Sequence, residues 1–170
     1  MTIYHSASAG GPVSGVSLGH RELAEADHWI LSLDPAPAYA CTHLVRDPFP
    51  HVAISLTGVA APESAPELQV AAESAATAKH GRAVLFPGVE RLVGVLSVAE
   101  VLALSAIERV EVLGSGIADA AATLDTTDFV RPQWRDGELV LTVVPAAGGV
   151  LVPFEVRSPT PCCAEHPAPE

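Results

Sequence analysis

Short apolar runs, separated by glycine, proline and small polar residues, recur along the chain and predict a protein built mainly from β-strands. Residues 51–57 have the length and the β-branched content of a strand, and Gly58 follows them. Residues 28–33, which end at Asp34-Pro35, and residues 109–113 show similar features. We therefore expect a strand in each of these three segments.

Two further runs flank the turn dipeptide Pro87-Gly88 and predict a hairpin, with strands over residues 82–86 and 91–96. Residues 68–78 fit two structures. Their alanines favour a helix, whereas a short alternation of larger and smaller apolar side chains suits a strand. We expect a strand there.

The last regular stretch predicts a three-stranded antiparallel meander. Residues 129–135 and 138–144 flank Asp136-Gly137, a dipeptide that two-residue type I′ hairpin loops favour. A second turn at residues 147–149 returns the chain as residues 150–156. Because both connections are short, the three strands should pair in sequence order.

One segment carries clear signals of a helix. Ser97 and Glu100 are spaced as a capping box, in which each side chain can bind a backbone N–H group at the helix start. The apolar face that follows consists of Val101, Leu102, Leu104 and Ala106. We expect one short helix near residues 98–106.

Together these assignments predict a mostly β fold, either an antiparallel sandwich or an α+β sheet with one short helix and the C-terminal meander. The connections are too short for repeated β–α–β crossovers. A chain of 170 residues suits a single domain, which we place at residues 21–157. Residues 1–20, rich in glycine, serine and alanine, are expected to form a flexible arm, and residues 158–170 a proline-rich extended tail.

The charge of the chain argues against two classes of partner. Its net charge is −11, and Lys79 is the only lysine. Nucleic acids and anionic membrane surfaces both require clustered basic residues, so neither is expected as a partner. No stretch has the pattern of a signal peptide or of a membrane-spanning segment, which predicts a cytoplasmic protein without membrane insertion. We expect another protein, or a second copy of this one, as partner.

Cysteine and histidine residues suggest a metal site. Cys162, Cys163 and His166 supply two thiols and an imidazole within five residues of the tail, and these are the donor types that bind Zn²⁺ or Cu⁺. A second pair, Cys41 and His43, could add donors from the body of the protein. All three cysteines of the chain would then belong to one site.

Other interpretations of the cysteines remain open. The spacing lacks the Cys-x2-Cys pattern of structural zinc sites, and adjacent cysteines share one tetrahedral ion poorly. Cys41 could be a small buried hydrophobic residue, and the other two ordinary residues of an exposed tail. Cys162 and Cys163 could also form a strained vicinal disulfide.

These observations lead to three functional hypotheses. The first is a non-enzymatic accessory or binding protein whose Cys/His tail holds a soft metal, Zn or Cu, or docks on a partner. The second is a structural or interaction subunit of a larger protein assembly with the tail as its docking element, where exposed strand edges would also suit pairing with another chain. The third is a small enzyme with a pocket near Cys41, His43 and His51, although no nucleophile, base and orienting group can be assigned by spacing.

Overall fold

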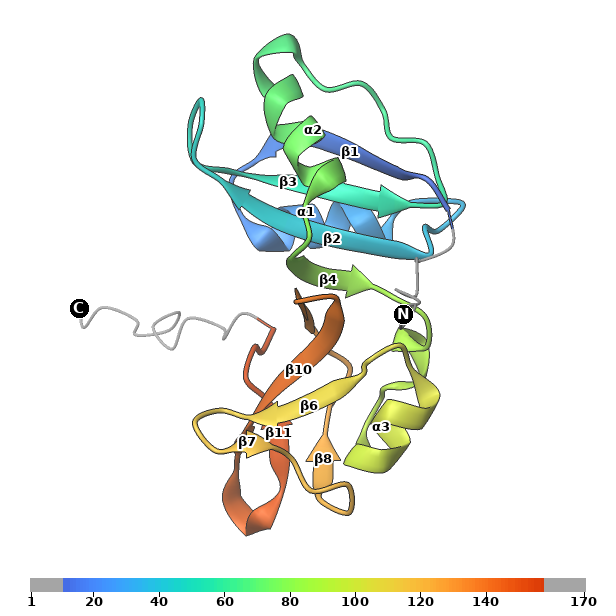
Figure 1. The fold of residues 1–170 in the computed structure, drawn as a ribbon, viewed down its shortest axis with the longest axis vertical. Coiled ribbons are helices and arrows are strands. Elements are labelled where there is room, and N and C mark those ends of the chain that lie inside the picture. Colours follow the sequence, from blue (N-terminus) through green and yellow to red (C-terminus); the bar gives the residue numbers. More distant parts are fainter. Residues whose placement is uncertain (1–10, 158–170) are drawn as a thin grey trace, which may run out of the picture.

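The computed structural model describes residues 11–157, which form an α+β fold (Figure 1). Within this range one mixed, mostly antiparallel sheet contains eleven strands, and three α-helices accompany it. The α+β expectation is therefore confirmed. The sandwich is wrong, because strand pairing continues from the N-terminal half into the C-terminal half and leaves no second sheet to pack on the first.

The main path of the sheet runs in the order β1-β3-β2-β4-β9-β10-β11-β8-β5, while β6 pairs with β10 and β7 pairs with β6. The helices are α1 (Leu23–Leu31), α2 (Gln69–Thr77) and α3 (Val98–Leu104). The strands are β1 (Val13–His20), β2 (Tyr39–Val45), β3 (His51–Thr57), β4 (Gly81–Leu85), β5 (Val95–Ser97), β6 (Arg109–Val112), β7 (Gly116–Ile117), β8 (Thr123–Asp125), β9 (Gln133–Arg135), β10 (Glu138–Pro145) and β11 (Leu151–Pro153). No helix in this part of the chain is both long and apolar enough to cross a bilayer.

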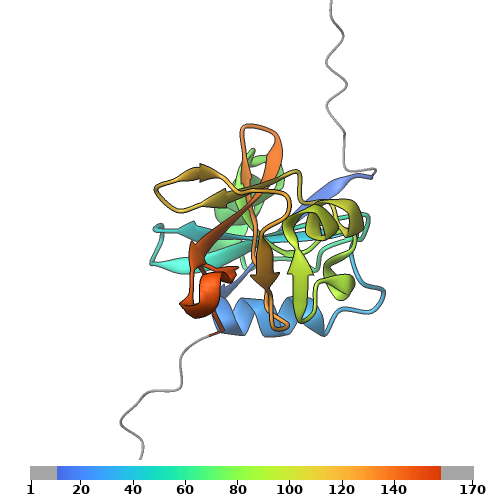
Figure 2. The same cartoon turned by 90° about the horizontal axis from the view of Figure 1, so that it is seen from below.

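In the N-terminal half, α1 and α2 cover opposite faces of the sheet formed by β1, β3, β2 and β4 (Figures 1 and 2). Side chains alternate between the two faces of a strand, and β3 is buried on both. Ile54 of β3 packs in the core that includes Ile30 of α1, whereas the neighbouring Ala53 packs against Ala71 and Ala75 of α2. Because both faces of β3 are buried, its apolar residues follow one another without polar alternation. This continuous run is the pattern that predicted the strand.

Small side chains let α2 approach the sheet closely. A Cβ atom placed on Gly15 of β1 would lie 1.8 Å from the carbonyl oxygen of Ala72, so this position requires glycine. The helix buries Ala71, Ala72 and Ala75 as its inner face. The small side chains therefore let the backbone of α2 contact the backbone of β1. A larger side chain at these positions would prevent this contact.

Two segments expected as strands are helices, and both corrections have a physical reason. Residues 28–31 of this segment form the end of α1, whose buried positions Ala26 and Ile30 are one helical turn apart. Its capping box uses Glu22 and Glu25 and lacks the usual serine or threonine. Residues 69–77 form α2, where helix propensity of alanine prevails over the short alternation. Within the expected N-terminal arm, Val13–His20 form β1.

The C-terminal half confirms the meander and the third helix. Strands β9, β10 and β11 pair antiparallel in sequence order, and α3 starts at Ser97 with the expected capping box. The hairpin across Pro87-Gly88 is wrong, because β5 pairs with β8 and β4 pairs with β2 and β9. Gly88 instead packs against the end of α3, where an added Cβ would lie 2.0 Å from the Leu104 carbonyl oxygen.

A buried network of charges joins the two halves. Arg82 of β4 donates two hydrogen bonds to Asp27 of α1, from Nη1 to Oδ1 at 2.7 Å and from Nη2 to Oδ2 at 3.0 Å. Its Nε lies 2.7 Å from Oε1 of Glu155, which follows β11. Arg131, before β9, adds a 3.0 Å bond from Nε to Asp27 Oδ2. Two arginines thus balance two carboxylates, and the four residues link α1 and β4 to the C-terminal strands.

The pairing sets the ionisation of this network. Burial alone would raise the pKa of Asp27, but hydrogen bonds from Arg82 and the positive charges of Arg131 and Arg82 hold it below its ordinary value. Burial also disfavours the charged form of Arg82 and would by itself lower its pKa. The hydrogen bonds of Arg82 with Asp27 and Glu155 instead raise the pKa above its ordinary value. Both groups therefore stay charged in the folded protein.

Replacing Arg82 with methionine should destabilise the protein by roughly 3–5 kcal/mol, because Asp27 and Glu155 lose the charge that compensates their burial. The matched control is Arg91→Met, since the Arg91 side chain is 63% exposed and its ion-pair partner within residues 11–157, Glu90, lies 3.7 Å away. Its effect should stay within about 0.5 kcal/mol. Urea unfolding followed by tryptophan fluorescence measures both. Equal losses in the two variants would contradict a stabilising role for the network.

Candidate binding groove

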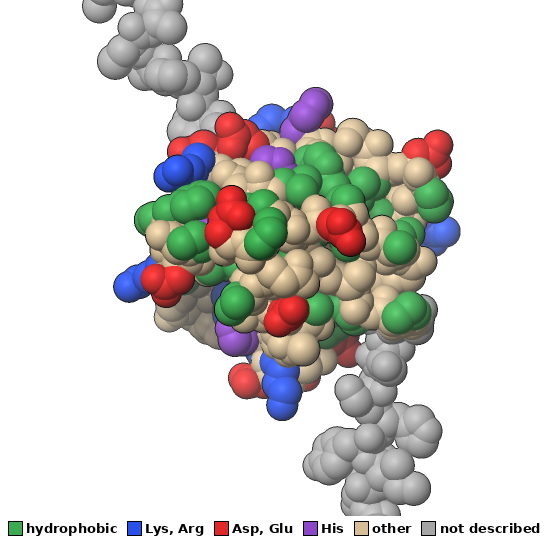
Figure 3. Space-filling model, turned by 90° about the horizontal axis from the view of Figure 1, so that it is seen from above, with side chains coloured by type: hydrophobic (Ala, Val, Ile, Leu, Met, Phe, Trp, Pro, Cys, Tyr) green, Lys and Arg blue, Asp and Glu red, His purple; other side chains and the backbone are tan. Residues whose placement is uncertain are grey.

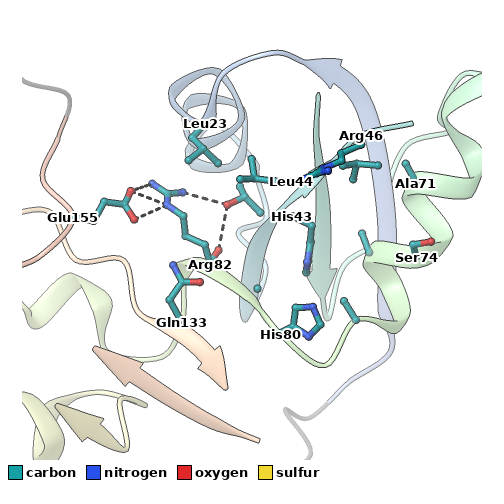
Figure 4. A pocket seen from close by; sticks show the side chains of 15 residues that line it. Leu23, His43, Leu44, Arg46, Ala71, Ser74, His80, Arg82, Gln133 and Glu155 are labelled. Atoms are coloured by element: carbon teal, nitrogen blue, oxygen red, sulfur yellow. Dashed lines mark hydrogen bonds and ion pairs between the residues drawn. The ribbon is translucent and has the colours of Figure 1, made fainter. Parts of the chain in front are cut away.

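A cavity of about 830 Å³ lies beside β2, between α1 and α2 (Figure 4). Strand β2 pairs with β3 over its full length, Tyr39–Val45, but with β4 only at Ala40, Cys41 and Thr42. Beyond Thr42, therefore, one side of β2 has no strand partner in the described part of the chain. We call this side of residues 43–46 the β2 edge, and the cavity along it the β2 groove.

The walls of the β2 groove differ in character. On the α2 side the lining is small, and it consists of Ala71, Ser74, Ala75 and Ala78. On the α1 side Leu23 faces the groove, and Leu44 of the β2 edge is 78% exposed. The exposed side chain of Leu44 gives the β2 edge apolar surface that a ligand could contact.

Charged groups lie at the two ends of the β2 groove. At one end Arg82, Gln133 and Glu155 line the wall, and Glu155 binds Arg82 as described above (Figure 4). Arg46 lines the groove near the other end of the β2 edge, and within residues 11–157 no carboxylate lies within ion-pair distance of it. On the face in Figure 3 the basic side chains lie apart from one another. The groove therefore carries no large charge of either sign.

Three polar side chains meet under α2, next to the groove. Register places Cys41 opposite Ser55 and His43 opposite Ala53, so Cys41, His43 and Ser55 share one face of the sheet. His43 Nε2 lies 2.8 Å from Ser55 Oγ. These residues also line a smaller cavity of about 210 Å³, which shares His43, Ala75, Ala78 and His80 with the β2 groove.

Burial keeps this cluster uncharged near neutral pH. The pKa of His43 is lowered to about 4, mainly by burial and also by His80, while a backbone hydrogen bond with His80 opposes the shift. Burial raises the pKa of Cys41 to about 12 against hydrogen bonds from Ser55 and Trp134. A protonated thiol is neither a strong nucleophile nor a metal ligand, so the cluster as arranged offers hydrogen bonds and apolar contact.

The structure brings together some of the residues expected at a site. Cys41 and His43 lie side by side on one face of β2, whereas His51 lies at the start of β3 with Nδ1 2.7 Å from the Phe49 carbonyl oxygen and lines neither cavity. Cys162, Cys163 and His166 lie outside the described residues. Within residues 11–157 no group of three or more His, Cys, Asp or Glu side chains is placed to hold a metal ion. Binding of Zn or Cu stays a prediction.

Sequence reasoning missed the features that define the groove. Ser55 could have been found by aligning the alternation of β2 with that of β3, because it stands two residues from Ala53 on the same face. The ion pair of Arg82 with Asp27 joins residues 55 positions apart, and no local sequence pattern predicts it. The β2 edge depends on where β4 stops pairing, which only the register reveals.

Comparison with known proteins identifies no relative. No family model matches the chain, and neither a curated protein nor a solved structure is similar enough to match. The case for function therefore depends on the geometry of the β2 groove.

The low pKa of His43 makes folding sensitive to acid. Its ordinary pKa is 6.5 and its folded-state pKa about 4, so below pH 6.5 the unfolded chain binds a proton that the folded chain does not. Stability should fall as the pH drops from 6.5 towards 4, by about 3 kcal/mol from this residue alone.

Urea unfolding of the native chain and of His43→Gln between pH 7.5 and pH 4 isolates this contribution. Glutamine can still hydrogen bond but does not titrate, so the variant should lose less stability over the range. Curves that stay parallel for the two proteins would show that His43 titrates normally in the fold.

Proposed function

We propose that this protein is a non-enzymatic binding protein that holds an extended segment of another polypeptide, which adds as a strand to the β2 edge. The observation that carries the proposal is the β2 edge itself: residues 43–46 line a groove between two helices, and β4 stops pairing with β2 at Thr42. At Ala40, Cys41 and Thr42 this side of β2 is occupied by β4. A ligand strand would lie on the same side, in line with β4.

Backbone chemistry favours a polypeptide over a small ligand. An unpaired strand edge presents a row of N–H and C=O groups, and another extended backbone is the partner that matches their spacing. The apolar contribution comes from Leu44 and Leu23 on one side of the groove and from the alanines of α2 on the other. The groove thus combines main-chain hydrogen bonds, which give affinity, with space for side chains on both faces.

Overall charge narrows the class of partner. The net charge of −11 makes strongly anionic partners unfavourable at long range. The basic side chains that would bind a nucleic acid backbone form no cluster in the groove, where Arg82 is already paired with Asp27 and Glu155. A neutral or basic segment of a protein satisfies both conditions.

A random-peptide display library, selected against the full-length protein, tests the proposal. Peptides should be enriched, and their binding should slow amide hydrogen exchange at residues 43–46. Ser74→Trp places a large side chain in the groove from an exposed position and should weaken binding at least about tenfold. Val70→Trp is the matched control, because Val70 is 74% exposed on the same helix and does not line the groove.

Two results would contradict strand addition at this edge. One is the absence of any enriched peptide. The other is enrichment of peptides that bind both tryptophan variants equally and leave exchange at residues 43–46 unchanged, since such peptides would occupy another surface.

A further inference from the structure

A hydroxyl and an imidazole lie beside the smaller cavity in the positions of a nucleophile and its base. Ser55 of β3 and His43 of β2 are both half-buried, and both line this cavity. Their side chains come from neighbouring strands on the face under α2, with Ser55 Oγ 2.8 Å from His43 Nε2. A serine becomes a nucleophile when a base within hydrogen-bond distance can take its proton. The pair has the geometry that this chemistry requires.

The other side of the His43 ring is held by the start of β4. A Cβ atom placed on Gly81 would lie 2.6 Å from Cε1 and 3.2 Å from Nδ1, so the backbone of β4 lies directly against this side. Burial lowers the pKa of His43, and a hydrogen bond with the backbone of His80, the residue before Gly81, acts in the opposite direction. A backbone group that favours the charged imidazole is an acceptor, so it is the His80 carbonyl oxygen.

These two contacts determine the tautomer of His43. With a pKa of about 4 the ring is neutral near pH 7 and carries a single N–H group. The His80 carbonyl oxygen can only accept, so this N–H lies on the side of β4 and Nε2 accepts the hydrogen bond from the Ser55 hydroxyl. A serine, an imidazole and a group that orients the imidazole make up a serine triad, and here a backbone carbonyl stands in the place of the aspartate.

The cavity beside Ser55 suits a small acyl group. Its volume of about 210 Å³ is below the roughly 300–1,000 Å³ of pockets that hold drug-sized ligands. The hydroxyl of Tyr39 and the indole of Trp134 line it, and both can donate a hydrogen bond to a carbonyl oxygen. His43 and His80 line both this cavity and the β2 groove (Figure 4), which gives a bulkier leaving group space next to the acyl group.

The weak basicity of His43 narrows the class of acyl donor. Burial is the main reason that its pKa is about 4, well below neutral pH. Because a base of this strength assists proton removal only modestly, the acyl donor must carry a leaving group that departs readily. Activated esters, such as aryl esters, meet this condition, whereas amides do not.

We infer that Ser55 is an acylation site, at which the hydroxyl accepts a short acyl group from an activated ester with His43 as the base. Ser55 Oγ bonds to the acyl carbon, its proton passes to His43 Nε2, and the bond between the acyl carbon and the leaving oxygen breaks with its electron pair. His43 then gives the proton to the leaving group. Acylation of one serine per chain requires no turnover, so the reaction goes beyond strand binding at the β2 edge and does not rest on it.

The reaction of p-nitrophenyl acetate with the full-length protein tests this inference. Absorbance follows the release of p-nitrophenol, and peptide mass spectrometry locates the acetyl group. We expect a burst of one equivalent per chain, with the acetyl group on Ser55, and Ser55→Ala should abolish it. Ser14→Ala is the matched control and should keep the burst, because the Ser14 hydroxyl donates to the Val59 carbonyl oxygen at 2.9 Å instead of to an imidazole.

His43→Gln separates the role of the base from that of the hydroxyl. Glutamine can still hydrogen bond with Ser55 but cannot take its proton, so acetylation of Ser55 should be at least about a hundredfold slower. Far-UV circular dichroism of each variant checks that the fold is retained.

Two results would overturn the inference. One is acetylation that is absent, or that falls on Lys79 and on histidines at the same rate in Ser55→Ala as in the native chain. The other is acetylation of Ser55 at the native rate in His43→Gln. Release beyond the first equivalent, abolished in Ser55→Ala, would support Ser55 as the nucleophile and contradict instead the non-enzymatic part of the proposed function. Strand addition is measured separately by exchange at residues 43–46, so either proposal can fail without the other.

Discussion

The buried pairing of Arg82 with Asp27 and Glu155 is the interaction on which the arrangement of this protein depends. Arg82 belongs to β4, the strand through which the N-terminal half of the sheet continues into the C-terminal half. Its guanidinium binds α1 on one side and the segment after β11 on the other. Charges buried in this way must be paired, so the helix, the strand and the C-terminal segment have to assemble together.

The same pairing defines where the β2 groove begins. Arg82 and Glu155 form one end of it, and Gly81, the first residue of β4, packs so closely that an added Cβ would lie 2.6 Å from His43 Cε1. Glycine at this position lets β4 pair with β2 at Thr42 while His43 stays under α2. Beyond His43 the neighbouring position beside β2 has no strand in the described part of the chain. The network that joins the halves thus also fixes the boundary between the paired and the open part of β2.

Local signals in the sequence predicted a large part of this fold. The β-branched run of β3, the capping box of α3 and the Asp136-Gly137 turn each act over a few residues, and each prediction is confirmed. The failures have two causes. At α2 the helix propensity of alanine prevails over a short apolar alternation, whereas the strand after Pro87-Gly88 pairs with β8, which lies far from it in the sequence.

Part of the candidate site could likewise be predicted from local spacing, and part of it could not. A Cys-x-His spacing on a strand correctly places Cys41 and His43 on one face, because side chains alternate with a period of two. Their partner Ser55, the ion pair across 55 positions and the point where β4 leaves β2 all depend on register between strands. A groove made by the absence of a neighbouring strand leaves no local pattern in the sequence.

Amide hydrogen exchange of the unliganded full-length protein tests the central claim most directly. At residues 43–46 the amides that point away from β3 should exchange far faster than the amides of β3, which has a strand partner on each side. Protection at residues 43–46 equal to that of β3 would mean that the β2 edge is already covered, and would contradict the account.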